Sequence, residues 1–103
     1  MSGYFQKNPS RGLTLRLDWA CAGLREGETI ERDLGWSIYP MQGSISDLKV
    51  ITPEINGRIS KASLIGGMPS KTYFATASVR TDQRRDLKRS VVVRVSSKKE
   101  DQR

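Results

Sequence analysis

A chain of 103 residues is long enough for one domain and too short for two. One cysteine and no histidine exclude an intrachain disulfide, a Cys/His zinc cluster and a Ser-His or Cys-His nucleophile pair. The net charge of +7 favours a polyanionic partner, either nucleic acid or an acidic protein surface, and nine of the 18 basic residues fall within residues 80–103.

The first twelve residues, MSGYFQKNPSRG, are predicted to form an extended arm outside the folded domain, because Pro9 and Gly12 discourage a helix or strand there. The two aromatics Tyr4 and Phe5 would be exposed on a lone monomer, and we predict that they dock on a neighbouring subunit or partner protein. The alternative is that the arm folds back over the open end of its own domain. No apolar stretch has the length of a signal peptide or of a membrane span, so we expect a reducing compartment and no membrane contact.

Three strands are predicted in the first half of the domain. Residues 13–19, LTLRLDW, alternate between apolar and polar side chains, which is typical of a half-buried strand. Residues 28–33 and residues 34–39 are read as two further strands, the second of which ends at Pro40. Cys21, which follows an apolar run, is predicted to be a small buried thiol.

Four more strands are predicted at residues 48–51, 58–65, 73–79 and 91–95. A turn near residues 53–57 contains the pair Asn56-Gly57, which suits a tight hairpin. The last two strands are predicted to form a hairpin with a long charged tip over residues 81–87.

Seven short strands without a convincing helix are typical of an all-β sandwich. Tyr73 lies early in the penultimate strand after a glycine-rich turn, and this placement resembles the tyrosine corner of immunoglobulin-like domains. We therefore expect an immunoglobulin-like β-sandwich of about seven strands over residues 13–96, followed by a polar tail over residues 97–103. Trp19, Trp36 and Tyr73 are predicted to be largely buried.

Two charged segments are candidate sites. The acidic group Glu26, Glu28, Glu31 and Asp33 lacks the pattern of a calcium loop, so we interpret it as a solvated strand rather than an acid/base pair or a cation site. The basic group Arg84, Arg85, Lys88 and Arg89 alternates with aspartates and contains no aromatic for base stacking. We predict that this group is solvated or contacts protein, with contact to nucleic-acid phosphates as the alternative. No catalytic, cofactor-binding or metal-binding residue is predicted, and the chain is not expected to be an enzyme.

A series of short motifs, each present once, extends along almost the whole chain. An opening with an aromatic pair followed by Lys-x-Pro precedes a strand ending in Asp-Trp, a Gly-x-Thr-Ile strand and a Trp-Ser strand. A Gly-Gly turn then leads into a tyrosine strand, an Asp-x-Arg loop and a Ser-Val-x-Val strand. The matching residues are Tyr4, Phe5, Lys7, Pro9, Asp18, Trp19, Gly27, Thr29, Ile30, Trp36, Ser37, Gly66, Gly67, Tyr73, Asp82, Arg84, Ser90, Val91 and Val93.

In this order and spacing the sequence resembles the phage fibre-tail adaptor proteins of small tailed bacteriophages. The resemblance implies a structural virion protein, assembled in the bacterial host cytoplasm, that joins head and tail or tail and fibre parts. Its implied partners are other virion structural proteins, in several symmetric copies per particle. Two alternatives stay open: a capsid decoration protein with the same fold, and a nucleic-acid-binding module that uses the basic hairpin.

Overall fold

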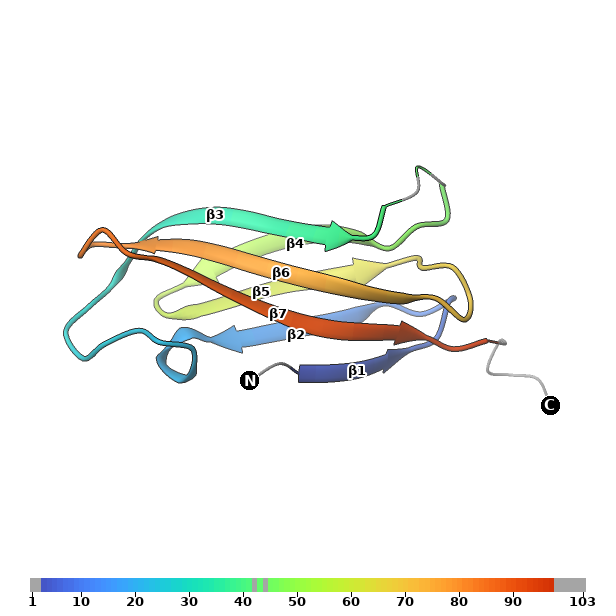
Figure 1. The fold of residues 1–103 in the computed structure, drawn as a ribbon, viewed down its shortest axis with the longest axis horizontal. Helices are drawn as coiled ribbons and strands as arrows, with labels where there is room; N and C mark the ends of the chain where they lie inside the picture. Colours follow the sequence, from blue (N-terminus) through green and yellow to red (C-terminus); the bar gives the residue numbers. More distant parts are fainter. Residues whose placement is uncertain (1–2, 42, 44, 98–103) are drawn as a thin grey trace.

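The computed structural model describes residues 3–41, 43 and 45–97, which form seven strands and one short 3₁₀ helix (Figure 1). None of these described residues forms a helix long and apolar enough to cross a membrane. In chain order the elements are β1 (Gly3–Lys7), β2 (Leu13–Asp18), η1 (Trp19–Cys21), β3 (Ile30–Tyr39), β4 (Lys49–Asn56), β5 (Ile59–Ile65), β6 (Thr72–Thr81) and β7 (Asp86–Val95).

The strands form two sheets that pack face to face, which confirms the predicted β-sandwich. The larger sheet has the order β1-β7-β6-β3 and the smaller sheet the order β2-β5-β4 (Figure 1). Strand β1 runs parallel to β7, and all other neighbours are antiparallel. The orders β3-β6-β7 and β2-β5-β4 match those of the corresponding strands in immunoglobulin constant domains, but β1 joins the opposite sheet. The immunoglobulin-like assignment therefore stays a prediction.

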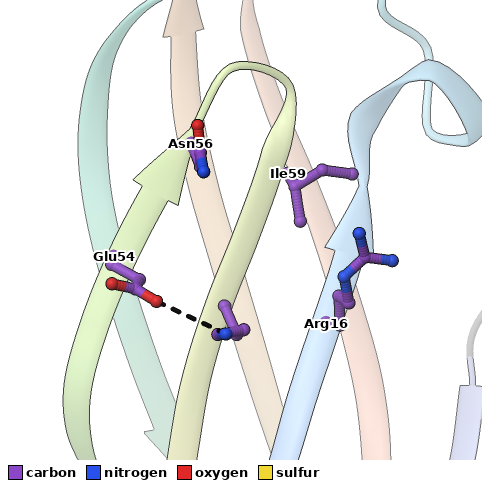
Figure 2. Close-up of a pocket in the computed structure, with 5 residues that line it drawn as sticks. Arg16, Glu54, Asn56 and Ile59 are labelled. Atoms are coloured by element: carbon purple, nitrogen blue, oxygen red, sulfur yellow. Dashed lines mark ion pairs between the residues drawn. The ribbon is translucent and has the colours of Figure 1, made fainter.

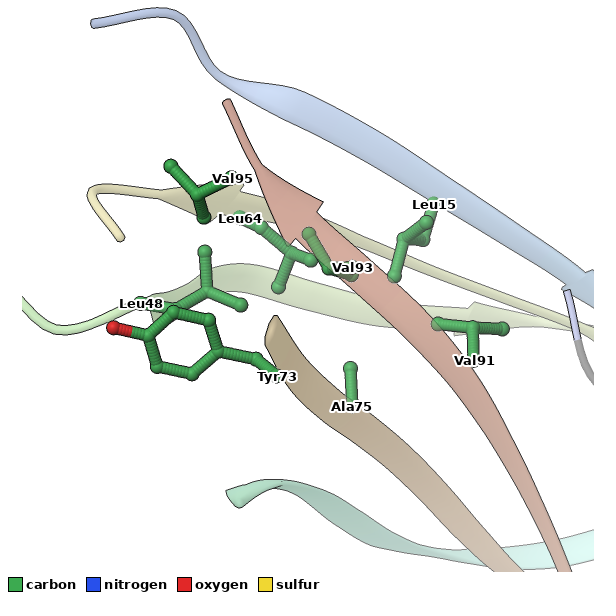
Figure 3. Close-up of a cluster of buried hydrophobic side chains, with 8 residues drawn as sticks. All are labelled: Leu15, Leu48, Leu64, Tyr73, Ala75, Val91, Val93 and Val95. Atoms are coloured by element: carbon green, nitrogen blue, oxygen red, sulfur yellow. The ribbon is translucent and has the colours of Figure 1, made fainter. Parts of the chain in front are cut away.

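The core consists of side chains that alternate along the strands and meet between the sheets. Figure 3 shows its larger cluster, in which Tyr73 and three valines of β7 contact leucines of the opposite sheet; the members are Leu15, Leu48, Leu64, Tyr73, Ala75, Val91, Val93 and Val95. A second cluster surrounds Trp19. Trp19 and Tyr73 are fully buried, as predicted, whereas Trp36 is only partly buried and contacts both clusters from the edge strand β3.

The hydroxyl of Tyr73 anchors the loop before its strand. It accepts a hydrogen bond from the backbone N–H of Met68 (3.1 Å) and donates one to Oδ1 of the buried Asp47 (3.1 Å). Burial raises the pKa of this phenol, because the charged form would be poorly solvated. The bond to a backbone group just upstream is the contact that the tyrosine-corner comparison suggests.

Two of the predicted strand ends are wrong because β3 and β4 continue past them. Residues 28–33 and 34–39 were expected to be separate strands, but β3 is continuous from Ile30 to Tyr39 and its pairing with β6 shifts at Gly35. Gly35 has φ of 98°, and its N–H bonds to Oδ1 of Asp33, so a bulge absorbs the interruption. Strand β4 likewise runs through Pro53 to Asn56, because Pro53 lies at a bulge of an edge strand, where its missing N–H is tolerated.

The prediction that Pro9 and Gly12 keep strand structure out of the N-terminal segment is wrong for residues 3–7. These residues form β1, which closes the larger sheet by pairing with β7. Phe5 faces inward and packs against the core, and the ammonium of the buried Lys7 donates to the carbonyl oxygens of Gly66 (2.6 Å) and Asn8 (3.0 Å). Pro9 and Gly12 lie in the connection after the strand and so do not interrupt it.

The prediction of a buried Cys21 thiol is also wrong, because this cysteine is exposed. Strand β2 ends at Asp18, which is also the N-cap of η1. The carboxylate of Asp18 accepts a hydrogen bond from the N–H of Ala20. Trp19 occupies the core at this turn, and Cys21 falls on its outer side.

Candidate partner-binding surface

The four basic residues predicted near the hairpin tip do not form one patch. Strand β6 extends to Thr81 and β7 begins at Asp86, so the tip contains only residues 82–85 and is shorter than expected. Arg84 is exposed in the left-handed conformation at this turn (φ 62°), and Lys88 is exposed on the outer face of the larger sheet. Arg85 and Arg89 are both half-buried and turn toward other parts of the domain.

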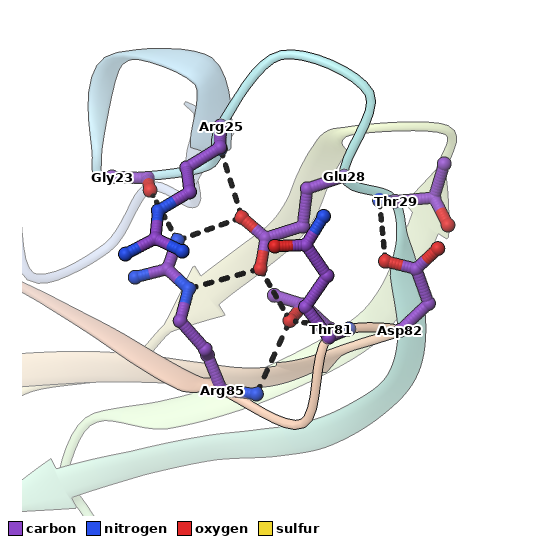
Figure 4. A network of polar contacts seen from close by, with 8 residues as sticks. Gly23, Arg25, Glu28, Thr29, Thr81, Asp82 and Arg85 are labelled. Atoms are coloured by element: carbon purple, nitrogen blue, oxygen red, sulfur yellow. Dashed lines mark hydrogen bonds and ion pairs between the residues drawn. The ribbon is translucent and has the colours of Figure 1, made fainter.

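Arg85 is bound by a buried carboxylate (Figure 4). Its Nη2 donates to Oε1 of Glu28 at 2.7 Å and its Nε donates to Oε2 at 3.0 Å, which is the paired geometry that guanidinium and carboxylate groups favour. Glu28 also accepts from the hydroxyl of the buried Thr81 (2.6 Å) and from the N–H of Arg25 (2.8 Å). The prediction that Glu28 is a solvated strand residue is therefore wrong, since its side chain is enclosed by donors.

The same network ties the hairpin tip to the segment before β3. Nη2 of Arg85 donates to the carbonyl oxygen of Gly23 (2.7 Å), while Asp82 and Thr29 exchange two hydrogen bonds. Hydrogen bonds from Arg85 lower the pKa of Glu28 to about 2, so this carboxylate is ionised at neutral pH. Because Glu28 and Thr81 hold it in place, Arg85 acts as a structural residue.

Arg89 points into the open side of the sandwich. It lies on the inward parity of β7 between Leu87 and Val91, and its Nη1 is 3.4 Å from the carbonyl oxygen of Cys21. Its buried Nε makes no hydrogen bond within the described part of the chain. Together with Phe5, this side chain lines a groove between the edges of the two sheets.

A row of apolar side chains crosses the outer face of the larger sheet. Tyr4 on β1 lies opposite Val92 on β7, Val92 lies opposite Phe74 on β6, and Phe74 lies opposite Tyr39 on β3. Tyr4 is 63% exposed, Tyr39 71% and Phe74 44%, whereas Val92 is partly covered. We call Tyr4, Val92, Phe74 and Tyr39 the aromatic row.

Polar rows flank the aromatic row on both sides. On one side Ser37, Thr76 and Ser90 lie opposite one another, and the hydroxyls of Thr76 and Ser90 are 2.7 Å apart. On the other side Arg94 lies opposite Thr72 and Gln6. The sheet thus presents an apolar centre with a polar rim, an arrangement typical of protein interfaces.

The sequence prediction included only part of this surface. Tyr4 was identified as a partner-binding residue, and it is exposed, whereas Phe5 faces the core. Tyr39 and Phe74 were missed, although each has the outward parity of its strand. An aromatic residue on the polar side of an alternating strand could have identified both residues as exposed. It does not show which residues of other strands lie beside them.

The outer face of the smaller sheet carries a small hollow of about 140 Å³ (Figure 2). Arg16, Glu54, Asn56, Ile59 and Lys61 line it, and Lys61 and Glu54 form an ion pair of 3.6 Å across it. Its volume is below the roughly 300–1,000 Å³ of typical ligand pockets. Among the residues that the structure describes, no three Cys, Asp or Glu side chains form a group that could hold a metal ion.

A comparison with protein-family models finds one described as podophage GP4 fiber-tail adaptor protein gp77, which matches residues 7–94 of the 103. No curated protein matches the chain.

Proposed function

The chain belongs to the podophage GP4 fiber-tail adaptor protein family, and from this premise we propose that it joins tail and fibre parts of the particle as a non-enzymatic protein in several symmetric copies. Family membership gives it a structural adaptor role in a tailed phage. The proposed partners are other structural proteins of the virion. The chain is proposed to be synthesised in the host cytoplasm and to reside in the assembled particle. We propose neither a cofactor nor a membrane partner.

The observation that carries this proposal is the aromatic row on a face built from four paired strands. Exposed aromatics on a rigid sheet lose little conformational entropy when a partner covers them, and buried aromatics are frequent anchors of protein interfaces. Tyr4, rather than Phe5, carries the proposed role of the N-terminal pair, because Phe5 already packs against the core.

The basic hairpin supports nucleic-acid binding less well than a protein contact. Arg85 is engaged by Glu28, and Arg80 forms an ion pair with Asp86 (2.8 Å), so two of the cations near the tip are already neutralised. Arg84 and Lys88 stay exposed and are proposed to contact an acidic protein surface. Contact through phosphates would make affinity for duplex DNA fall steeply with salt, and retarded migration of duplex DNA at low salt would favour that alternative.

Stoichiometry separates the adaptor from a capsid decoration protein. A closed ring at a tail connection holds few copies, whereas a decoration protein is present at a number comparable with the capsid subunits. Quantitative mass spectrometry of purified particles measures this ratio. The proposal expects far fewer copies of this chain than of the capsid protein, and a ratio near one would assign the chain to the capsid surface instead.

A further inference from the structure

We infer that the aromatic row binds a different virion protein. The contact surface of that partner is an apolar strip bordered by Asp or Glu side chains. This inference rests on the proposed function and adds the chemistry of the partner. Strands of a sheet are about 4.8 Å apart, so the row from Tyr4 to Tyr39 spans about 14 Å. Three of its four side chains are exposed, and Val92 lies between Tyr4 and Phe74.

Cations lie in both directions along the strands, with Arg94 beside the row and Lys88 beyond the hydroxyl residues Ser37, Thr76 and Ser90. Arg94 lies two residues along β7 from Val92, about 7 Å away, and Lys88 lies four residues in the other direction, about 13 Å away. Both side chains are exposed. Among the residues that the structure describes, Asp82, Asp86 and Glu31 are carboxylates that lie beyond Lys88 near Arg80, which binds Asp86 at 2.8 Å. Within the described part of the chain, the charged side chains on this face that lie nearest the row are therefore Arg94 and Lys88.

This charge pattern disfavours a second copy as the occupant. Two copies packed face to face share a two-fold axis in the plane of contact. A two-fold axis along the row places Lys88 of one copy opposite Arg94 of the other. A two-fold axis across the row places each cation opposite the same cation of the other copy. Both arrangements bring like charges together between chains that each carry a net charge of +7. A partner with carboxylates beside its apolar strip instead places negative charges opposite Lys88 and Arg94.

Single-stranded nucleic acid is the competing occupant, because bases stack on exposed aromatics and phosphates attract cations. The observations favour protein for two reasons. The row next to the aromatics on the Lys88 side consists of the small hydroxyl residues Ser37, Thr76 and Ser90, which offer neutral hydrogen-bonding groups and no charge for phosphates. The family is described as an adaptor between fibre and tail, which are protein parts.

The test uses the full chain in phage particles, supplied to a phage that lacks its own copy of the gene. Four variants are compared: the pair Tyr39→Ala with Phe74→Ala, the pair Lys88→Glu with Arg94→Glu, and two controls on the opposite outer face, Ile51→Ala and Arg16→Glu. Ile51 and Arg16 are exposed, so the controls likewise remove an apolar side chain or reverse a charge, but on the other outer face. Quantitative mass spectrometry counts the chain in each particle, and thermal melting of the purified variants verifies that each one folds.

We expect both test pairs to melt like the parent and to lower incorporation at least tenfold, while both controls incorporate normally. A photoreactive phenylalanine derivative in place of Tyr39 is expected to cross-link to another virion protein, at a peptide with Asp or Glu near the linked residue. Cross-linking to this same chain, to DNA or to a peptide without acidic residues overturns the inference, as does normal incorporation of the test pairs. Absence of the parent chain from particles would instead overturn the proposed function.

Discussion

The carboxylate of Glu28 and the guanidinium of Arg85 form a two-point ion pair between residues 57 positions apart in the sequence (Figure 4). This pair fastens the β6–β7 hairpin to the segment that enters β3. It brings together a glutamate from the acidic segment and an arginine from the basic segment, which the sequence presents as two unrelated charged stretches.

The Glu28–Arg85 pair predicts a loss of stability in acid. Its hydrogen bonds lower the pKa of Glu28 from an ordinary value of 4.5 to about 2. The folded state therefore holds the proton less tightly than the unfolded state, so stabilisation is complete above pH 4.5 and decreases as the pH falls toward 2. Urea denaturation from pH 6 to pH 2 measures this dependence.

The matched variant for that experiment is Glu28→Gln, which keeps the shape of the side chain and removes its charge. We expect it to be less stable than the parent at pH 7 and to show a flatter decline in unfolding free energy below pH 4.5. Glu26→Gln, in the same loop but exposed, serves as the control. Parallel pH curves for the parent and Glu28→Gln would contradict the assignment of this proton to Glu28.

Trp19→Ala is expected to lower the free energy of unfolding by about 3–5 kcal/mol, because it removes a fully buried indole from the core. It also deletes the hydrogen bond from Nε1 of Trp19 to Oγ of Ser60 (2.8 Å). Trp36→Ala is expected to have a smaller effect, since Trp36 is only partly buried. Equal losses for the two variants in urea denaturation would show that their burial is wrongly ranked.

Gly66→Ala is expected to be more destabilising than Gly57→Ala. Both glycines have positive φ (77° and 64°), so each alanine adopts a strained backbone conformation that costs on the order of 1–2 kcal/mol. A Cβ at Gly66 would also lie 2.9 Å from the backbone oxygen of Asp47, whereas nothing lies within 4 Å of one at Gly57. The difference in unfolding free energy between the two variants measures this clash, and a zero difference would contradict it.

Deletion of residues 1–10 is expected to destabilise the isolated domain by about 2 kcal/mol or more, because it removes β1 and the packing of Phe5. An extended arm outside the folded domain, as the sequence alone predicts, would leave melting unchanged when deleted. Tyr4→Ala is the matched control, since Tyr4 faces solvent and its replacement should change stability by less than about 0.5 kcal/mol. Unchanged melting of the deletion variant would mean that β1 contributes little to the fold.

Much of the fold could be predicted from the sequence because alternation along a strand is a local property. Parity alone places Leu15 and Leu17 on one face of β2 and Val91, Val93 and Val95 on one face of β7, and all five are buried. The β-sandwich class, the N-terminal boundary of β2 and the burial of Trp19 and Tyr73 followed from the same pattern. The family resemblance also rested on the order of such local motifs.

Other features depended on contacts between distant segments, and these only the tertiary structure decided. Lys7 is buried because the carbonyl oxygen of Gly66, 59 residues away, accepts a hydrogen bond from its ammonium, and the burial of Glu28 likewise depends on Arg85. Strand β1 exists because β7 offers it a free edge. The aromatic row follows the same logic: parity could place Tyr39 and Phe74 on an outer face, but only the pairing register brings them beside Val92 and Tyr4. Register is set by backbone hydrogen bonds between strands, which a single strand's sequence does not contain.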